Sequence, residues 1–154
     1  MVKVAINSIA KGKDFERKVA QLLTKRFGVK FARTPRSGAF GTTSKINAYK
    51  GDIFTTSKRW NEKYNATIEC KSRKTPITLE QYVRYLIGLD GDMLKWVKQC
   101  IRQSTNGKDN YSDFWLIFKY NFSSEFIVVG KRINNTWVIT DPIFLNTYLQ
   151  KIVT

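Results

Sequence analysis

The sequence predicts an α/β domain in which helices flank a central mixed β-sheet. Amphipathic stripes at helical spacing occur within residues 8–27 and 79–104. Short alternating or strongly apolar segments lie between and after these stretches, and such segments are typical of strands. The chain has 154 residues, which fits one domain, over 1–154, with a sizeable core.

The first predicted helix covers residues 8–27 and is ended by Gly28. Its apolar stripe is formed by Phe15, Val19, Leu22, Leu23 and Phe27. Glu16 lies beside Phe15 at the edge of this stripe, so it can point toward the sheet. A solvated glutamate on a charged helix is the other interpretation, and the helix alone favours it.

Residues 29–33 are a predicted strand, and a loop follows it. Arg33, Arg36 and Ser37, together with nearby glycines, make this loop a candidate for phosphate binding. An ordinary surface loop is the alternative, which composition alone favours. A polar loop over residues 42–50 continues the connection.

Two short strands are predicted at residues 52–56 and 67–72, joined by a charged hairpin connection. On the second strand, Glu69 and Lys71 share one face and lie roughly 6.5–7 Å apart. Asp52 joins them if the two strands pair alongside, which the short connection favours. In that connection, Trp60 is expected either to contact DNA, with Arg59 and Lys63, or to pack against the strands with Tyr64.

This set of side chains suits metal-assisted cleavage of a phosphodiester. Two carboxylates, from Asp52 and Glu69, can hold a hard cation such as Mg²⁺ through oxygen. The cation generates a nucleophile from water and stabilises charge on the phosphate. Lys71 can orient that water or neutralise the developing charge.

The second half of the sequence predicts two helices, at 79–89 and 93–104, and two buried strands, at 114–118 and 125–129. A hairpin turning at Asn134-Asn135 and a last helix starting at Asp141-Pro142 follow. The helix predicted at 93–104 has an apolar stripe, which is most simply explained as part of the hydrophobic core. The stripe is formed by Met93, Trp96, Val97, Cys100 and Ile101.

Composition narrows the function classes. Lys and Arg number 27 against 12 Asp and Glu, and the net charge of +15 indicates a polyanionic partner, most simply nucleic acid. The absence of histidine excludes His-based triads, His-metal nucleases and most zinc sites. Two cysteines without metal spacing, no convincing signal peptide and no apolar run of membrane-spanning length favour a reducing cytoplasm without a membrane partner.

Four motifs occur in order along the chain: Lys11-Gly-x-x-Phe-Glu16, Arg-x-Ser-Gly with its serine at Ser37, Gly-Asp-Ile at 51–53, and Glu69-x-Lys-Ser. Together they resemble the PD-(D/E)XK nuclease superfamily, and within it the archaeal and phage Holliday junction resolvases. The resemblance covers roughly residues 10–130. One departure is Gly51, which stands where the superfamily name has Pro.

The resemblance implies a restriction-endonuclease-like fold and a set of site residues. A metal ion, Mg²⁺ with Mn²⁺ as a substitute, would be held by Asp52, Glu69, the backbone carbonyl of Cys70 and, directly or through water, Glu16. Lys71 and Ser37 would complete the catalytic centre, and Gln99 is a secondary candidate against the alternative of a solvated glutamine. The expected phosphate contacts are Lys13, Arg17, Arg33, Arg36, Arg73 and Lys74.

By the same resemblance, the expected protein is a homodimer that nicks branched double-stranded DNA in the cytoplasm of a prokaryote or a virus-infected host cell. No organic cofactor is expected. Restriction and homing endonucleases share the catalytic motif, so a sequence-specific cutter is the alternative. A non-catalytic DNA-binding module ranks lower, and net charge does not separate DNA from RNA.

Overall fold

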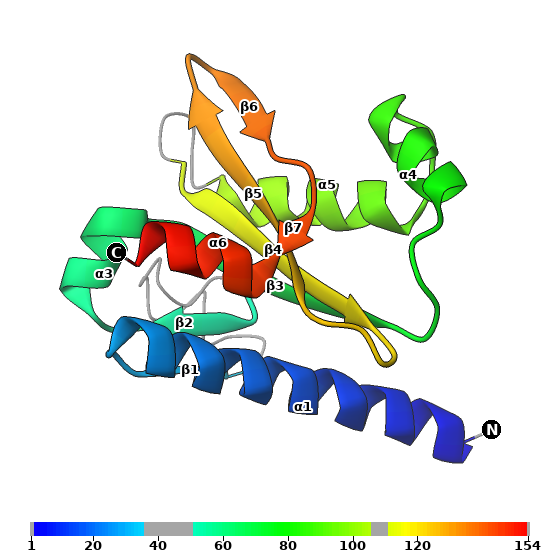
Figure 1. The fold of residues 1–154 in the computed structure, drawn as a ribbon, viewed down its shortest axis with the longest axis horizontal. Coiled ribbons are helices and arrows are strands. Elements are labelled where there is room, and N and C mark those ends of the chain that lie inside the picture. The colour runs from blue at the N-terminus through cyan, green and yellow to red at the C-terminus, as the bar shows by residue number, and fades with distance from the viewer. Residues whose placement is uncertain (1, 36–50, 106–110, 154) are drawn as a thin grey trace.

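The fold is a mixed sheet within layers of helices, seen in a computed structural model that describes residues 2–35, 51–105 and 111–153 (Figure 1). Arg36, Ser37 and the loop at 42–50 lie outside these ranges. The sheet has seven strands. In spatial order they are β1 (Phe31–Arg33), β2 (Ile53–Thr55), β3 (Ala66–Arg73), β4 (Asp113–Tyr120), β5 (Phe126–Ile133) and β6 (Thr136–Ile139), with β7 (Ile143–Phe144) also paired to β5. Only β3 and β4 pair in parallel within this described sheet, so the predicted mixed sheet is confirmed.

Strand β4 shows how the two faces of the sheet are covered. Trp115 and Ile117 face one apolar cluster, and Phe114, Leu116 and Phe118 face the other. The first cluster is closed by α1 (Val2–Phe27), α3 (Lys58–Tyr64) and α6 (Leu145–Ile152), and the second by α5 (Asp92–Ser104). Both faces are therefore buried, which gives the restriction-endonuclease-like arrangement predicted from the sequence.

The connection between β2 and β3 differs from its prediction. Residues 58–64 form the helix α3 and not a hairpin connection. The side chain of Ser57 caps it by accepting a hydrogen bond from the backbone N–H of Trp60, at 3.3 Å. Trp60 and Tyr64 are one turn apart and both turn toward the sheet, where Trp60 is only 5% exposed. The packing interpretation of Trp60 is thus confirmed.

Two helix starts also differ. α1 begins at Val2 and so is longer than predicted. The last helix begins at Leu145, because Ile143 and Phe144 extend the chain and pair with β5, so Asp141 is not its N-cap. The predicted hairpin turn at Asn134 and Asn135 is confirmed, with φ values of 50° and 61° that asparagine tolerates well.

Helix α4 (Leu79–Leu86) exposes most of its aliphatic side chains. Its inward side chains are tyrosines: Tyr85 packs against the α5 cluster and Tyr82 donates a hydrogen bond to Asp141 at 2.5 Å. Burial and this bond raise the pKa of Tyr82 to about 12. Its outward surface, with the turn that follows, exposes Leu79, Val83, Leu86, Ile87 and Leu89. This apolar surface, called here the α4 face, has no cover among the described residues.

Candidate active site

Asp52 is fixed by the backbone on both sides and by its own carboxylate. Its N–H donates to the carbonyl of Ile68 at 2.8 Å, and its carbonyl accepts from Thr34 at 2.9 Å. The carboxylate oxygen Oδ2 accepts a hydrogen bond from the backbone N–H of Cys70 at 2.8 Å. Asp52 therefore lies against β3 immediately beside Glu69, as the sequence predicted if the strands paired.

Gly51 makes this approach possible. Its φ is +81°, and a Cβ atom added there would lie 2.4 Å from the carbonyl oxygen of Ile68. Proline fixes φ near −65°, so it does not fit this backbone. The replacement of the superfamily's proline by Gly51 thus has a local cause, because the chain reaches β3 through a residue in the left-handed backbone conformation.

Glu69, Lys71 and Gln99 form a hydrogen-bonded network on the face of β3 that α5 covers. The amide Nε2 of Gln99 donates to Glu69 Oε1 at 2.9 Å, and Lys71 Nζ donates to Gln99 Oε1 at 2.8 Å. Lys71 Nζ is also 3.6 Å from Glu69 Oε1. Glu69 is 3% exposed, so these partners replace water around a buried carboxylate.

Gln99 is the residue that sequence reasoning undervalued, because a solvated glutamine was an equally good interpretation of its position. The structure places it in the network instead. The available signal was its position beside Cys100 at the edge of the apolar stripe of α5, which is also how Glu16 lies beside Phe15 on α1. A polar residue at such an edge can reach the sheet.

Glu69 is a buried carboxylate beside a second acid. Burial and, after it, the adjacent Asp52 carboxylate raise the pKa of Glu69 to about 8, although Lys71 opposes part of this shift. The Oε2 atom of Glu69 is buried and accepts no hydrogen bond from the described residues. Crowded carboxylates with an unpartnered buried oxygen are the environment that a bound Mg²⁺ would stabilise, so the donor set fits the metal.

Glu16 is buried and faces the same strand from the opposite layer. Its Oε2 pairs with Arg33 Nε at 2.6 Å, and its side chain is 7% exposed. Burial raises the pKa of the Cys70 thiol well above its usual value, and the charges of Asp52, Glu69 and Glu16 raise it further. The three acids therefore surround Cys70. No group of three acid or cysteine side chains close enough to hold one ion occurs in the described ranges.

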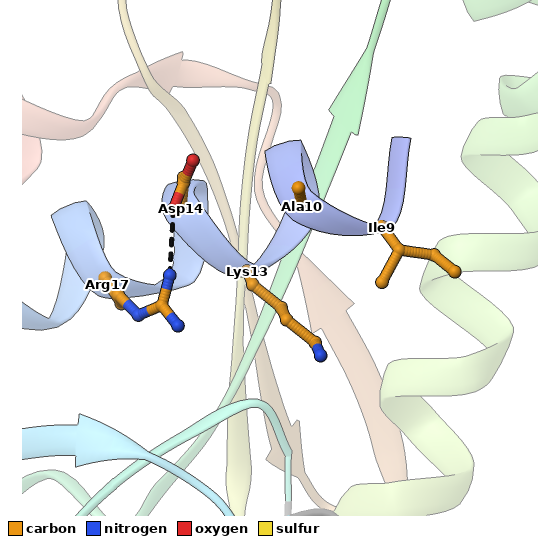
Figure 2. Close-up of a pocket in the computed structure, with 5 residues that line it drawn as sticks. All are labelled: Ile9, Ala10, Lys13, Asp14 and Arg17. Carbon is orange, nitrogen blue, oxygen red and sulfur yellow. Dashed lines mark hydrogen bonds and ion pairs between the residues drawn. The ribbon is translucent and has the colours of Figure 1, made fainter. Parts of the chain in front are cut away.

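The predicted phosphate contacts divide into two groups. Lys13, Arg17 and Lys74 are exposed, whereas Arg73 is largely covered and lies 3.5 Å from Asp92. Figure 2 shows the Lys13 and Arg17 side chains projecting from α1, and Arg17 is paired to Asp14 at 2.8 Å. They line a shallow hollow of about 300 Å³ with Ile9 and Ala10, which contains none of the predicted site acids. Arg36 and Ser37 lie outside the described residues.

A family model described as "Phage putative PDDEXK endonuclease" matches residues 7–149. The chain belongs to this family. No curated protein and no solved structure gives a significant match.

Membership in this PD-(D/E)XK family confirms the superfamily predicted from the motifs and makes the chain a nuclease. The matched segment contains the whole constellation of Asp52, Glu69, Lys71 and Gln99. Among the described helices of this PD-(D/E)XK protein, none is long and apolar enough to span a membrane.

Proposed function

We propose that the protein is a Mg²⁺-dependent endodeoxyribonuclease that nicks branched double-stranded DNA, as Holliday junction resolvases do. The observation that carries the catalytic part is the contact between Asp52 and Glu69, with Lys71 held beside them by Gln99. The junction substrate is supported by the ordered motifs that resemble resolvases. Mn²⁺ would substitute for Mg²⁺ at oxygen ligands.

Each side chain has a distinct role in this proposal. Asp52, Glu69 and the backbone carbonyl of Cys70 would hold the cation, which when bound would lower the pKa of a coordinated water and offset charge at the phosphate. The Lys71 ammonium orients the attacking water and stabilises the negative charge that develops on the phosphate. Glu16 forms an ion pair with Arg33 at 2.6 Å and contributes a carboxylate behind β3. Ser37 is proposed to complete the centre.

The DNA backbone would be bound by basic side chains around these acids. Lys13 and Arg17 extend from the solvent side of α1, and Lys74 follows the end of β3. Arg33, Arg36 and Arg73 are the other proposed contacts. A net charge of +15 supports strong, salt-dependent binding to phosphates without base readout.

Two active sites are needed to nick opposed strands of a junction, and we propose that two copies associate through the α4 face. A two-fold axis near the middle of α4 would bring Leu79 of one copy to Leu86 of the other. In the same arrangement Glu80 of each copy meets Arg84 of the other. This charge pattern is self-complementary, which supports a second copy as the partner of the exposed leucines.

The test uses a labelled four-way junction, a linear duplex of the same sequence and a single strand, each with Mg²⁺ or Mn²⁺. Paired nicks in the junction alone, absent with Asp52→Asn, are expected. Cutting of the duplex at one fixed sequence would replace the resolvase proposal by a restriction or homing endonuclease. Tight binding without cutting in both metals would contradict catalysis and leave a binding module.

A further inference from the structure

The turn between β4 and β5 carries an aromatic side chain at its tip that packs against none of the apolar side chains in the described parts of the chain. Phe122 is 104% exposed, which is more than any other large apolar side chain that the structure describes. The rings just behind it are packed: Tyr120 and Phe118 both stack on Phe126. An exposed phenylalanine does not contribute the free energy that burial of its ring would give. Phe122 therefore differs from the neighbouring aromatic residues, which are packed.

The backbone holds Phe122 in a conformation that its residue type disfavours. Ser123 N donates to the carbonyl of Tyr120 at 3.0 Å, which closes a four-residue turn with Phe122 in the third position. Its φ is +64°, and turns with positive φ there usually carry glycine or asparagine. The Ser123 hydroxyl braces the turn by accepting from Tyr120 N at 3.0 Å. The phenyl ring is thus held outward on a rigid support.

The turn lies at the end of the sheet toward which the active-site strand runs. β3 pairs in parallel with β4, with Glu69 opposite Leu116 and Arg73 opposite Tyr120. Asn121 N then donates to the carbonyl of Arg73 at 3.1 Å, which joins the turn to β3. Figure 1 shows this turn projecting past the sheet where β3 ends.

The distance from the acids suits a duplex. From Leu116 to Asn121 an extended strand rises about 17 Å, which is about five base steps of DNA. The basic residues Arg73, Lys74 and Lys119 are at this end of the sheet. A ring held outward at the end of the sheet that carries these basic residues matches the chemistry of stacking on bases next to bound phosphates.

We propose that Phe122 is a wedge that stacks on an unstacked base of the DNA substrate, about five base pairs from the cut phosphate. The inference rests on the proposed function, because it names a second DNA contact of the same enzyme. Aromatic stacking accepts every base, so the contact would favour sites where stacking is already interrupted, such as branch points or flexible steps, over any one sequence.

The test places 2-aminopurine, whose fluorescence rises on unstacking, at successive positions of a junction and of a duplex. The proteins carry Asp52→Asn to keep the DNA intact, alone or with Phe122→Gly, Phe122→Trp or Ile133→Ala. Ile133 is half exposed at the far end of β5 and serves as the matched control. Phe122→Gly relieves the turn, so its thermal stability is expected to equal or exceed that of the parent.

We expect fluorescence to rise only at positions near the fifth base pair from the cut. This rise should occur with Asp52→Asn alone and when Phe122→Trp or Ile133→Ala is added to it. Phe122→Gly is expected to lose this rise and about tenfold in affinity, the scale of one base–aromatic contact. Fluorescence that is equal in the Asp52→Asn protein with and without Phe122→Gly, while the protein that retains Asp52 binds and cuts DNA, would overturn the wedge alone. A protein that retains Asp52 but neither binds nor cuts DNA would overturn the proposed function and the wedge together.

Discussion

The amide nitrogen of Gln99 lies 2.9 Å from Oε1 of Glu69 and donates a hydrogen bond to it. The other end of the same amide accepts from Lys71. One neutral side chain from α5 therefore fixes both the carboxylate and the ammonium of β3. Without it, Lys71 would be free to collapse onto Glu69, which is 3.6 Å away, and to neutralise the carboxylate proposed to hold the metal.

Gln99→Leu is expected to lower the cleavage rate by 10- to 100-fold, the usual cost of losing a residue that orients a metal ligand. DNA affinity should stay unchanged because no phosphate contact is lost. The measurement is single-turnover cleavage beside equilibrium binding. Gln21→Leu, at an exposed glutamine of α1, is the control. Equal cleavage rates for the two variants would show that Gln99 is only a packing residue.

The metal-free protein is expected to lose stability as the pH rises from about 4.5 to about 8. The pKa of Glu69 is about 8 in the folded chain against an ordinary value of 4.5, so the folded state binds more protons across this window. Stability gained from protonated Glu69 is therefore present below pH 4.5 and lost by pH 8. Thermal melting against pH measures this loss.

Two additions to the melting experiment test whether Glu69 is the group that titrates. Glu69→Gln should flatten this part of the profile and raise the melting temperature at pH 8, while abolishing cleavage. Mg²⁺ should stabilise the parent more at pH 8 than at pH 5, because the ion binds the deprotonated carboxylate. A profile that Glu69→Gln leaves unchanged would assign the titration to another group.

Gly51→Ala is expected to destabilise the fold by at least about 2 kcal/mol, because it adds left-handed strain and a clash with Ile68. Gly51→Pro should be worse, although proline gives the superfamily its name. Gly12→Ala is the control: position 12 is within α1 with no atom near its added methyl group, and the change should stabilise by about 0.5–1 kcal/mol. Urea unfolding measures all three changes. Tolerance of proline at 51 would refute the argument from φ.

The proposed two-fold contact of the α4 face is tested by a charge swap. Glu80→Arg places like charges opposite each other and should weaken self-association, and Arg84→Glu should do the same. The double swap should restore association, since it recreates the pairing with reversed signs. The self-association of each protein is measured by analytical ultracentrifugation at several protein concentrations. Val83→Asp should give a folded monomer. A parent that stays monomeric at every concentration would rule out this contact.

The acid site could be predicted because its parts follow local rules. Alternation along β3 places Glu69 and Lys71 on one face, and a short connection brings Asp52 beside them. The apolar stripe of α1 was likewise visible, and Phe15, Val19 and Leu23 are buried as predicted. These features depend on period and sequence distance alone.

The missed features depend on partners far away in the chain. α3 is too short for a clear helical period, and its helix is favoured because Trp60 and Tyr64 reach a cluster built from α1 and β4. The start of α6 was misplaced because the pairing of Ile143 with β5 overrides the capping signal at Asp141. Gln99 joined the site only through the packing of α5 on the sheet.

β3 meets β4 in parallel, so their contact closes a loop that contains both α4 and α5. Such long-range closure is slow compared with the formation of an adjacent antiparallel pair such as β2 and β3. During synthesis, Asp52 and Glu69 can meet well before α5 brings Gln99 to Lys71. We therefore expect a nascent chain to bring its acids together early and to position its lysine only after β4 has left the ribosome, so that the proposed cleavage activity would arise only once most of the protein exists.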